Sequence, residues 1–252
     1  MRYFRKDPFG KPYWLRSIVC TWAGFITWPG LNWTNKLKVQ GVEHLDALPD
    51  TGVLFVSNHQ TYYTDVIAMY HVFGSHKWGF KGRLINPLYL LSLRTNTCFV
   101  AAEETMKHSG LLPKLMALAG AVTVKRTWRK NGTDVEREVD FQEVNNIKLA
   151  LQDGWVITFP QGTTKPWAPG RKGTALLIKE EKPIVVPVVI NGFRRAFDKK
   201  GLRFKKRKTQ LSITIKAPLV LNYDDSPEDI LEQVMDGIEQ SDRFKFKHYQ
   251  TK

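Results

Sequence analysis

Residues 53–66 read VLFVSNHQTYYTDV, and this stretch sets the pattern for the rest of the chain. Residues 53–56 are all apolar, which is typical of a strand covered on both faces. Asn58 and His59 follow directly, and open α/β sheets usually place their functional groups at the carboxyl ends of their strands. The stretch therefore predicts a buried strand that presents His59 at a functional edge, with a helix starting near Asp65.

The pairing of His59 with Asp65 would suit proton transfer. A nearby carboxylate fixes the tautomer of an imidazole and stabilises the imidazolium that forms when the ring takes a proton. Without a nucleophilic Ser or Cys, such a pair can still act as a general base on a substrate hydroxyl. The residues alone leave open a second interpretation, in which His59 is a loop histidine beside a helix cap.

The rest of the chain predicts a single α/β domain. Its 252 residues are enough for one large core, and apolar β-branched runs alternate with helical patterns. We predict a mostly parallel or mixed sheet covered by helices, with strands at 52–57, 97–101, 120–125, 154–159, 184–190 and 210–217. Because proline cannot donate to a sheet ladder, Pro187 predicts an edge strand or a bulge.

Caps predict two of the helices that cover this sheet. Thr133 and Glu136 have the spacing of a capping box, which would open a helix running to about residue 151. Ser226 followed by Pro227 predicts a C-terminal helix that ends near residue 240. Both helices are expected to be structural.

The charge balance indicates an anionic partner. Thirty-eight Lys and Arg against 24 Asp and Glu give a net charge of +14, which would attract nucleic acid or a phospholipid surface. Tryptophan favours the boundary between lipid and water, and four of the eight Trp cluster near the N-terminus, at Trp14, Trp22, Trp28 and Trp33. This composition favours a membrane surface over nucleic acid.

The uncharged run 17–28 predicts how the chain meets that surface. It is shorter than the ~20 residues of a membrane span, and Pro29 and Gly30 interrupt the helical pattern after it. We predict a helix lying in the membrane interface, with an apolar face formed by Trp14, Ile18, Trp22 and Ile26. A buried first helix is the alternative; a cleaved signal peptide is disfavoured because no small-x-small site follows.

The two cysteines, Cys20 and Cys98, predict a reducing compartment, because they form no disulfide framework. We therefore expect membrane association on the cytoplasmic face. His71 and His76 are five residues apart and would not meet on one metal from a helix, and no other ligand set is convincing. We expect neither a metal nor a cofactor.

Two further stretches are suited to binding an anion. Residues 120–126, GAVTVKR, lead to Arg126, whose forked guanidinium suits a phosphate. In residues 157–174, ITFPQGTTKPWAPGRKGT, a turn at Gly162 could direct backbone N–H groups and two hydroxyls toward an anion. Each stretch, taken alone, can also be an ordinary strand end or loop.

In their order and spacing, these stretches and the strand proline resemble the motifs of the 1-acylglycerol-3-phosphate acyltransferase, or lysophospholipid acyltransferase, family. The resemblance runs from about residue 37 to 217. It implies the glycerolipid acyltransferase fold for residues 37–252, after a membrane-interface segment at 1–36. It also implies that His59 is the catalytic base and Asp65 orients it. The substrate-binding positions that we assign with it are Asn58, Gly120, Arg126, Gln161, Gly162, Thr163, Thr164, Lys165, Arg171 and Lys172.

Three departures from the family pattern are informative. Five residues, rather than four, separate His59 from Asp65. One extra helical residue turns a side chain by ~100°, so the pair requires a bulge within residues 60–64, before the helix. Gln161 replaces a Glu, and Thr164 replaces an Arg that the family uses for phosphate. Compensation would have to come from the basic residues Lys165, Arg171 or Lys172.

The resemblance implies acyl transfer from acyl-CoA or an acyl carrier protein to the hydroxyl of a lysophospholipid. The expected acceptor is 1-acylglycerol-3-phosphate, which would give phosphatidic acid. Alternatives are an acceptor without phosphate, an inactive relative, or a non-enzymatic basic protein that binds anionic membrane or nucleic acid. The basic run 194–208 supports the last alternative, but no nucleic-acid-binding motif accompanies it. A serine hydrolase is disfavoured because no Gly-x-Ser-x-Gly elbow occurs.

Overall fold

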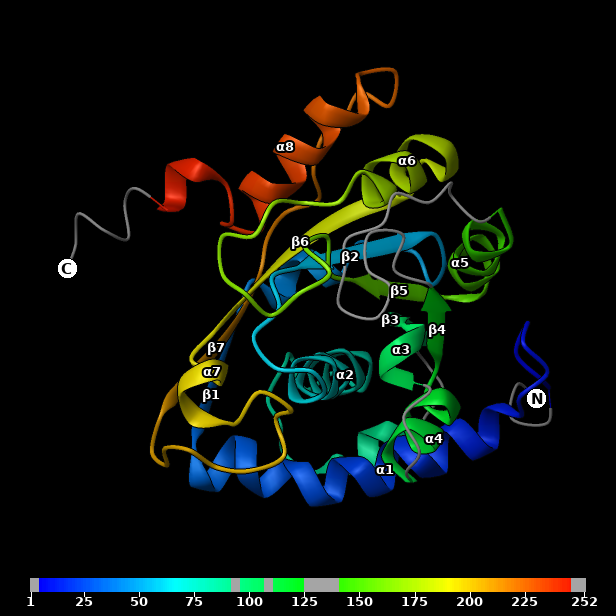
Figure 1. Cartoon of the computed structure of the whole chain (residues 1–252). Helices are drawn as coiled ribbons and strands as arrows, with labels where there is room; N and C mark the ends of the chain where they lie inside the picture. Colours follow the sequence, from blue (N-terminus) through cyan, green and yellow to red (C-terminus); the bar gives the residue numbers. More distant parts are fainter. Residues whose placement is uncertain (1–4, 92–95, 107–110, 125–140, 246–252) are drawn as a thin grey trace.

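A seven-stranded sheet forms the centre of the molecule. The computed structural model describes residues 5–91, 96–106, 111–124 and 141–245 (Figure 1). The strands lie in the order β1-β7-β6-β2-β5-β3-β4. Their bounds are β1 Lys36–Gln40, β2 Val53–Ser57, β3 Thr97–Ala102, β4 Ala121–Val124, β5 Trp155–Thr158, β6 Ile184–Asn191 and β7 Gln210–Ile215. Neighbouring strands pair in parallel except β6 and β7, which are antiparallel, so the predicted α/β sheet is confirmed.

Helices cover both faces of the sheet. The α-helices are α1 Tyr13–Pro29, α2 Thr64–Lys77, α3 Glu103–Met106, α4 Leu111–Leu118, α5 Phe141–Asp153, α6 Lys172–Glu181, α7 Phe193–Ala196 and α8 Pro227–Gly237. Three short elements are the π-helix η2 Gly30–Thr34 and the 3-10 helices η3 Val42–Leu45 and η4 Pro87–Leu91. Helix α2 lies on one face, whereas α5, α6 and α8 lie on the other, and α1 runs outside α2 (Figure 1).

Strand β2 is buried on both sides, as its sequence predicts. Val53 and Phe55 belong to the core beneath α2, where the Phe55 ring lies 4.4 Å from that of Phe73. Leu54 and Val56 belong to the second core, beneath α5, α6 and α8. Burial of each large apolar side chain stabilises the fold by about 1.5–3 kcal/mol, so the strand that carries the site is held from both faces.

The strand that contains Pro187 is not at an edge, contrary to expectation. Strand β6 lies between β2 and β7. The Pro187 carbonyl accepts a hydrogen bond from Lys216 at 2.9 Å, so its ring nitrogen also faces the β7 side. Pairing with β7 begins only at Val188. Pro187 and Lys216 are thus the next pair in register and keep one of the two hydrogen bonds of such a pair. The missing N–H falls at the end of the β6–β7 ladder, where an interior strand tolerates the proline.

The first helix is longer than the uncharged run predicts. It begins at Tyr13 and does not stop at Pro29, because the chain continues as the π-helix η2 to Thr34. The side chain of Asn35 donates a hydrogen bond to the Gly30 carbonyl at 3.0 Å, which satisfies one of the acceptors at this helix end. None of the helices within the described ranges combines the length and hydropathy needed to cross a bilayer.

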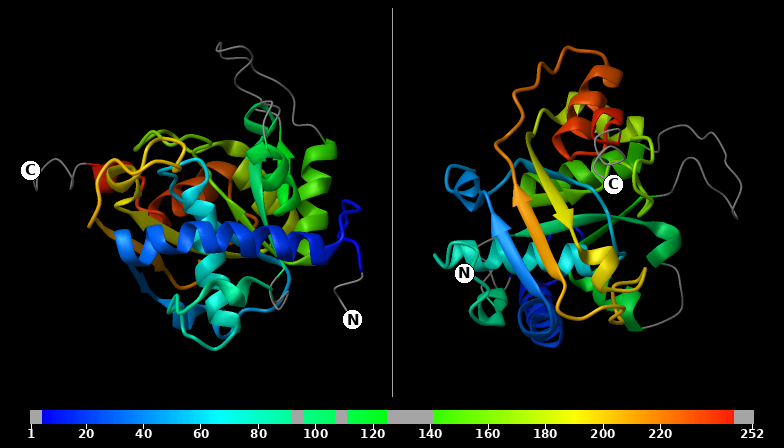
Figure 2. Two further views of the ribbon diagram at one scale, coloured as in Figure 1. Left: turned by 90° about the horizontal axis from the view of Figure 1, so that it is seen from below. Right: turned by 90° about the vertical axis from the view of Figure 1, so that its left-hand side faces the viewer.

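The apolar face predicted for α1 points to solvent. Trp22 is 68% exposed and Ile26 is 76% exposed, while Trp14 and Ile18 are also exposed. The opposite face packs on the domain through small and polar side chains: Gly24 lies against Leu90, and Ser17 donates to the carbonyls of Leu90 and Leu91. Seen from below, α1 lies across the surface of the molecule (Figure 2, left). It is therefore not the buried core helix of the alternative interpretation.

The two predicted caps have different outcomes. The Ser226 hydroxyl accepts a hydrogen bond from the Asp229 N–H at 3.1 Å and caps α8, which confirms that helix start. Helix α8 ends at Gly237, a few residues before the predicted end. The described part of α5 begins at Phe141, and the capping box of Thr133 and Glu136 lies outside the described residues.

Candidate active site

The candidate site is at the carboxyl edge of the parallel strands. Strand β2 lies between β6 and β5 and ends at Ser57. The side chain of Asn58 continues the pairing of β2 with β6 beyond the end of the strand. Its amide nitrogen donates to the Ile190 carbonyl at 2.8 Å, and its oxygen accepts from the Ile190 N–H at 2.7 Å. Asn58 is buried. It ties the end of β2 to β6 and so fixes where the next residue, His59, leaves the sheet.

His59 and Asp65 meet. The Nδ1 of His59 lies 3.0 Å from Oδ2 of Asp65, and the carboxylate is fully buried. The extra residue in the motif is absorbed as expected, because residues 60–63 form a non-helical turn and α2 begins at Thr64. Asp65 therefore occupies the first turn of α2 with its carboxylate directed back toward His59.

Backbone and side-chain donors hold the Asp65 carboxylate. Its Oδ2 accepts from the N–H groups of Gln60 and of Thr61, the latter at 3.0 Å, and its Oδ1 accepts from the Thr61 hydroxyl at 2.7 Å. Hydrogen bonds to a charged acceptor are stronger than neutral ones. The carboxylate thus organises the whole turn, as well as the imidazole.

The imidazole of His59 is fixed on a second side by Phe159. The two rings stack with centroids 4.0 Å apart and planes inclined by 25°. With Nδ1 bonded to Asp65, the ring carries its proton there in the neutral form and leaves the Nε2 lone pair available. Nε2 makes no hydrogen bond within the described residues, and 13% of the side chain remains exposed. This is the geometry of a general base.

The loop after β5 lies beside this pair. Gly162 adopts a positive φ of 61°, and its N–H donates to the Phe159 carbonyl at 2.9 Å. The Arg171 N–H closes the loop by donating to Pro160 at 2.9 Å. Of the loop residues predicted to bind substrate, Lys165 is exposed and Thr164 is buried. Thr163 is partly exposed, and its hydroxyl accepts from the Lys165 N–H at 3.3 Å.

Gln161 and Lys172 have partners within the protein. The Gln161 side chain is 1% exposed and donates to the Ala168 carbonyl at 2.8 Å, within the same loop. Gln240, which follows α8, accepts from the Trp167 N–H at 3.1 Å and supports the loop from outside. Lys172 forms an ion pair with Glu228 at 2.6 Å, and this contact raises the pKa of the lysine. Gln161 therefore braces the loop from within, and Lys172 ties the start of α6 to α8.

Arg194 is a cation at this site that the sequence analysis did not assign there. Its N–H donates to the Gln60 side chain at 3.1 Å, and its guanidinium donates to the Thr164 carbonyl. Burial lowers the pKa of Arg194, and the charge of Asp65 opposes that shift. The signal available in the sequence was its place three residues after the end of β6, at the same edge as His59.

Gly120 is not brought to His59. It precedes β4, and because β4 runs parallel to β3, and through β5 to β2, it lies at the amino edge of the sheet. Its φ is 106°, and an added Cβ would lie 2.9 Å from the Thr97 carbonyl, so glycine permits a close approach of two chain segments there. Arg126 lies outside the described residues. No group of three or more potential metal ligands occurs in the part of the chain that the structure describes.

Comparison with known proteins defines the class. A family model described as acyltransferase matches residues 36–191, and the chain belongs to this acyltransferase family. The match spans both His59 and the loop after β5.

Among solved structures, the chain is similar to the crystal structure of the 1-acyl-sn-glycerophosphate (LPA) acyltransferase PlsC from Thermotoga maritima. The TM-score is 0.55 at 18% identity, over 89% of this chain and 77% of that one. This likeness shows a shared fold. A search of curated proteins found no match.

Proposed function

We propose that the protein transfers a fatty acyl group from the thioester of coenzyme A or an acyl carrier protein to the free hydroxyl of a lysophospholipid. The proposed acceptor is 1-acylglycerol-3-phosphate, and the product is phosphatidic acid. The contact between His59 and Asp65 carries the proposal, because it leaves Nε2 of a correctly oriented imidazole open at the carboxyl edge of the sheet. The name of the structurally similar PlsC supports the choice of acceptor.

In the proposed reaction, Nε2 of His59 takes the proton of the acceptor hydroxyl as its oxygen attacks the thioester carbonyl. Asp65 stabilises the resulting imidazolium. A C–O bond forms, the tetrahedral intermediate collapses, and the C–S bond breaks. His59 then returns the proton to the departing thiolate, which leaves as the free thiol. The protein therefore ends the cycle in its starting protonation state, and the chemistry needs no resident cofactor.

Two further tasks fall to residues around the pair. Backbone N–H groups near Gly162 are candidates for stabilising the oxyanion, since preorganised donors contribute strongly where charge develops. Arg194 is a candidate for the acceptor phosphate, because its guanidinium lies at the Thr164 carbonyl, where the family pattern has an arginine side chain. Lys165 and Arg171 of the same loop, and Arg126 beyond β4, are the other proposed phosphate ligands. With Arg194 in this role, the acceptor's negative charge would lie beside the proposed base.

The proposed site of action is a membrane surface on the cytoplasmic face. The solvent-facing side of α1 supports attachment, because Trp22 and Ile26 are more than two-thirds exposed and Trp favours the lipid boundary. Cys20 and Cys98 are both free, which suits a reducing compartment. Membrane attachment would bring the enzyme to acceptors and products that both reside in the bilayer.

A direct assay tests this proposal. Purified protein is incubated with acyl-CoA or acyl carrier protein thioesters and a panel of lysolipids, and products are identified by mass spectrometry. Acylation of 1-acylglycerol-3-phosphate is the expected result. Acylation confined to lysolipids without a phosphate monoester would refute the assigned acceptor. No transfer from either donor, with a folded protein that still binds vesicles, would favour an inactive or purely lipid-binding relative.

A further inference from the structure

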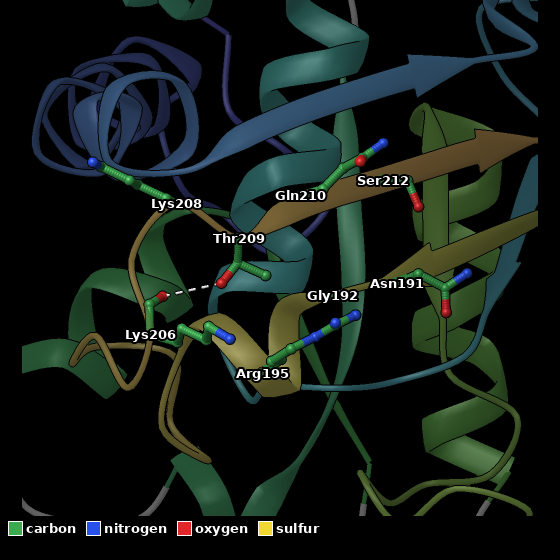
Figure 3. Close-up of a pocket in the computed structure, with 8 residues that line it drawn as sticks. All are labelled: Asn191, Gly192, Arg195, Lys206, Lys208, Thr209, Gln210 and Ser212. Carbon is green, nitrogen blue, oxygen red and sulfur yellow. Dashed lines mark hydrogen bonds between the residues drawn. The ribbon is translucent and has the colours of Figure 1, made fainter. Parts of the chain in front are cut away.

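A basic hollow lies between the ends of β6 and β7 and the segment that joins them. Its volume is about 360 Å³, and three cations line it: Arg195, Lys206 and Lys208. Asn191 and Ser212 add polar side chains from the two strands (Figure 3). Such a set of charged and neutral donors suits an anion with several oxygen acceptors, above all a phosphate.

Backbone hydrogen bonds hold the walls of the hollow in place. The Lys206 N–H donates to Ala196 at 3.2 Å, and the Lys208 N–H donates to Thr34 at 2.7 Å. Between them, the Thr209 hydroxyl donates to the Lys206 carbonyl at 3.2 Å. The backbone that carries the cations is thus fixed before any ligand arrives, which lowers the entropy cost of binding.

The positive charge of the hollow is not neutralised from within. None of the three cations forms an ion pair with a carboxylate of the described residues. The acidic residue of the joining segment, Asp198, accepts hydrogen bonds from the N–H groups of Leu202 and Arg203 at 2.7 and 3.1 Å. These bonds direct its carboxylate to the backbone of its own turn. Three cations that have no carboxylate partner in the described part of the chain would raise the local concentration of anions around the hollow.

The hollow also adjoins η2, the segment that continues α1 and carries the exposed Trp33. Lys208 is bonded to Thr34, which follows Trp33, a side chain that is 75% exposed. The ring of Phe204, in the same segment as Lys206, lies close enough to Gly30 that an added Cβ there would be 3.1 Å away. Exposed aromatic rings therefore border the cations. A phospholipid is complementary to this arrangement, because its phosphate lies just outside its apolar chains and could meet the cations while the chains meet the rings.

From this placement, we propose that the hollow binds the headgroup phosphate of an anionic membrane phospholipid, separate from the acceptor in the active site. The inference rests on the proposed attachment through α1 and adds to it a charge-selective contact. In this proposal, one defined site on the protein surface recognises the lipid headgroup. Binding of nucleic acid or of soluble nucleotides in the hollow is the alternative that the experiments must separate from headgroup binding.

Vesicle cosedimentation at physiological salt tests the site. The full chain is titrated with phosphatidylcholine vesicles with and without phosphatidylglycerol. The test variant changes Arg195, Lys206 and Lys208 to Gln. The matched control changes Lys200, Arg203 and Arg207, which belong to the same exposed segment but do not line the hollow. Circular dichroism and thermal unfolding verify that both variants are folded.

The control separates a binding site from diffuse attraction. Each Lys or Arg near an anionic surface contributes roughly a fivefold gain in affinity, so both variants lose some binding. A built site predicts that the hollow variant loses roughly tenfold more than the control, and only on vesicles that contain phosphatidylglycerol. Equal losses would overturn the site while leaving attachment intact.

Two other results would also overturn the proposal. If the native chain binds neither type of vesicle, the attachment through α1 fails, and the headgroup site fails with it. If the hollow variant binds vesicles like the control but loses affinity for DNA or for adenosine 3′,5′-bisphosphate, measured by calorimetry, the hollow serves a soluble phosphate instead. Acyl transfer is not measured in any arm, so the result is independent of turnover.

Discussion

The turn at residues 58–65 and the helix α1 differ in which side chains they expose to solvent. In the turn, polar groups are buried and paired: Asp65 is fully buried and receives bonds from His59, Gln60 and Thr61. In α1, the polar side is buried, with Arg16 paired to Asp7 at 2.5 Å, whereas Trp22 and Ile26 face solvent. Buried polar groups need partners inside the protein, and large exposed apolar surfaces indicate partners outside it.

This difference predicts two kinds of mutational response. Changes in the turn should reduce turnover, because the proposed mechanism needs the turn to hold His59 and Asp65 in contact. Changes on the outer face of α1 should leave folding and chemistry intact and reduce membrane binding, because those side chains contact little of their own chain.

The largest effect is expected at His59. His59→Ala removes the proposed base, and general-base catalysis contributes about 10²–10⁴-fold, so we expect kcat to fall on the order of 10³-fold. His76→Ala is the matched control, since its ring is similarly covered but lies at the other end of α2, near Asp46. Steady-state kinetics measure both variants, with thermal unfolding as the check on folding. Near-native turnover by His59→Ala would exclude it as the base.

Asp65→Asn should have the next largest effect. The amide keeps the size of the side chain but loses the charge that stabilises the imidazolium, and we expect kcat to fall about 10²-fold. Lost charge-assisted bonds to the turn should also lower the free energy of unfolding by about 1–3 kcal/mol. Asp46→Asn, at the exposed carboxylate that pairs with His76, is the control. Lower stability with unchanged kcat would make Asp65 a helix cap alone.

The sequence predicted the parts of this site that depend on local pattern. The burial of β2 and the position of His59 follow from four apolar residues and the sheet-edge rule. The sequence predicted the contact with Asp65 only if a bulge preceded the helix, because spacing does not reveal where a helix begins. The structure meets that condition with the turn before Thr64.

Long-range packing supplied what the sequence could not. Strand β1 was missed although its five residues alternate exposed polar side chains with half-buried Leu37 and Val39, because it is short and its pairing with β7 joins positions far apart in the chain. Arg194 was read as part of a basic run, because its contacts with Gln60 and Thr164 come from two other segments. Arg194 has no local periodicity that would identify its place at the site, whereas the alternation in β1 was a strand signal that the sequence analysis overlooked.

On the side of α1, a double substitution should affect binding alone. Trp22→Glu with Ile26→Glu removes two exposed apolar side chains, each worth about 1.5–3 kcal/mol when fully buried. We expect vesicle affinity to fall roughly a hundredfold, while the free energy of unfolding changes by about 0.5 kcal/mol or less. Leu176→Glu with Val220→Glu, two exposed apolar positions away from α1, is the control. Vesicle binding that survives the α1 change would refute attachment through this helix.

The smallest effect is expected at Gln161. Like the polar groups of the turn, its side chain is buried and hydrogen-bonded within the protein, although it carries no charge. Gln161→Glu restores the acidic residue of the family pattern, yet the amide nitrogen here donates to the Ala168 carbonyl and lies 3.4 Å from the Gln240 side-chain oxygen. A carboxylate would set negative oxygen against two acceptors in a site that is 1% exposed.

We therefore expect Gln161→Glu to lower the free energy of unfolding by about 1–3 kcal/mol, as measured by urea unfolding. Lowering the pH should recover part of the loss, because a protonated carboxyl can donate where the amide did. Gln240→Ala in the same background should also relieve part of it, since that change removes one facing acceptor. A Glu variant as stable as the native chain would mean that the loop can reorganise around a charge. In that case the hydrogen bonds donated by the Gln161 amide would not be what holds the loop beside His59.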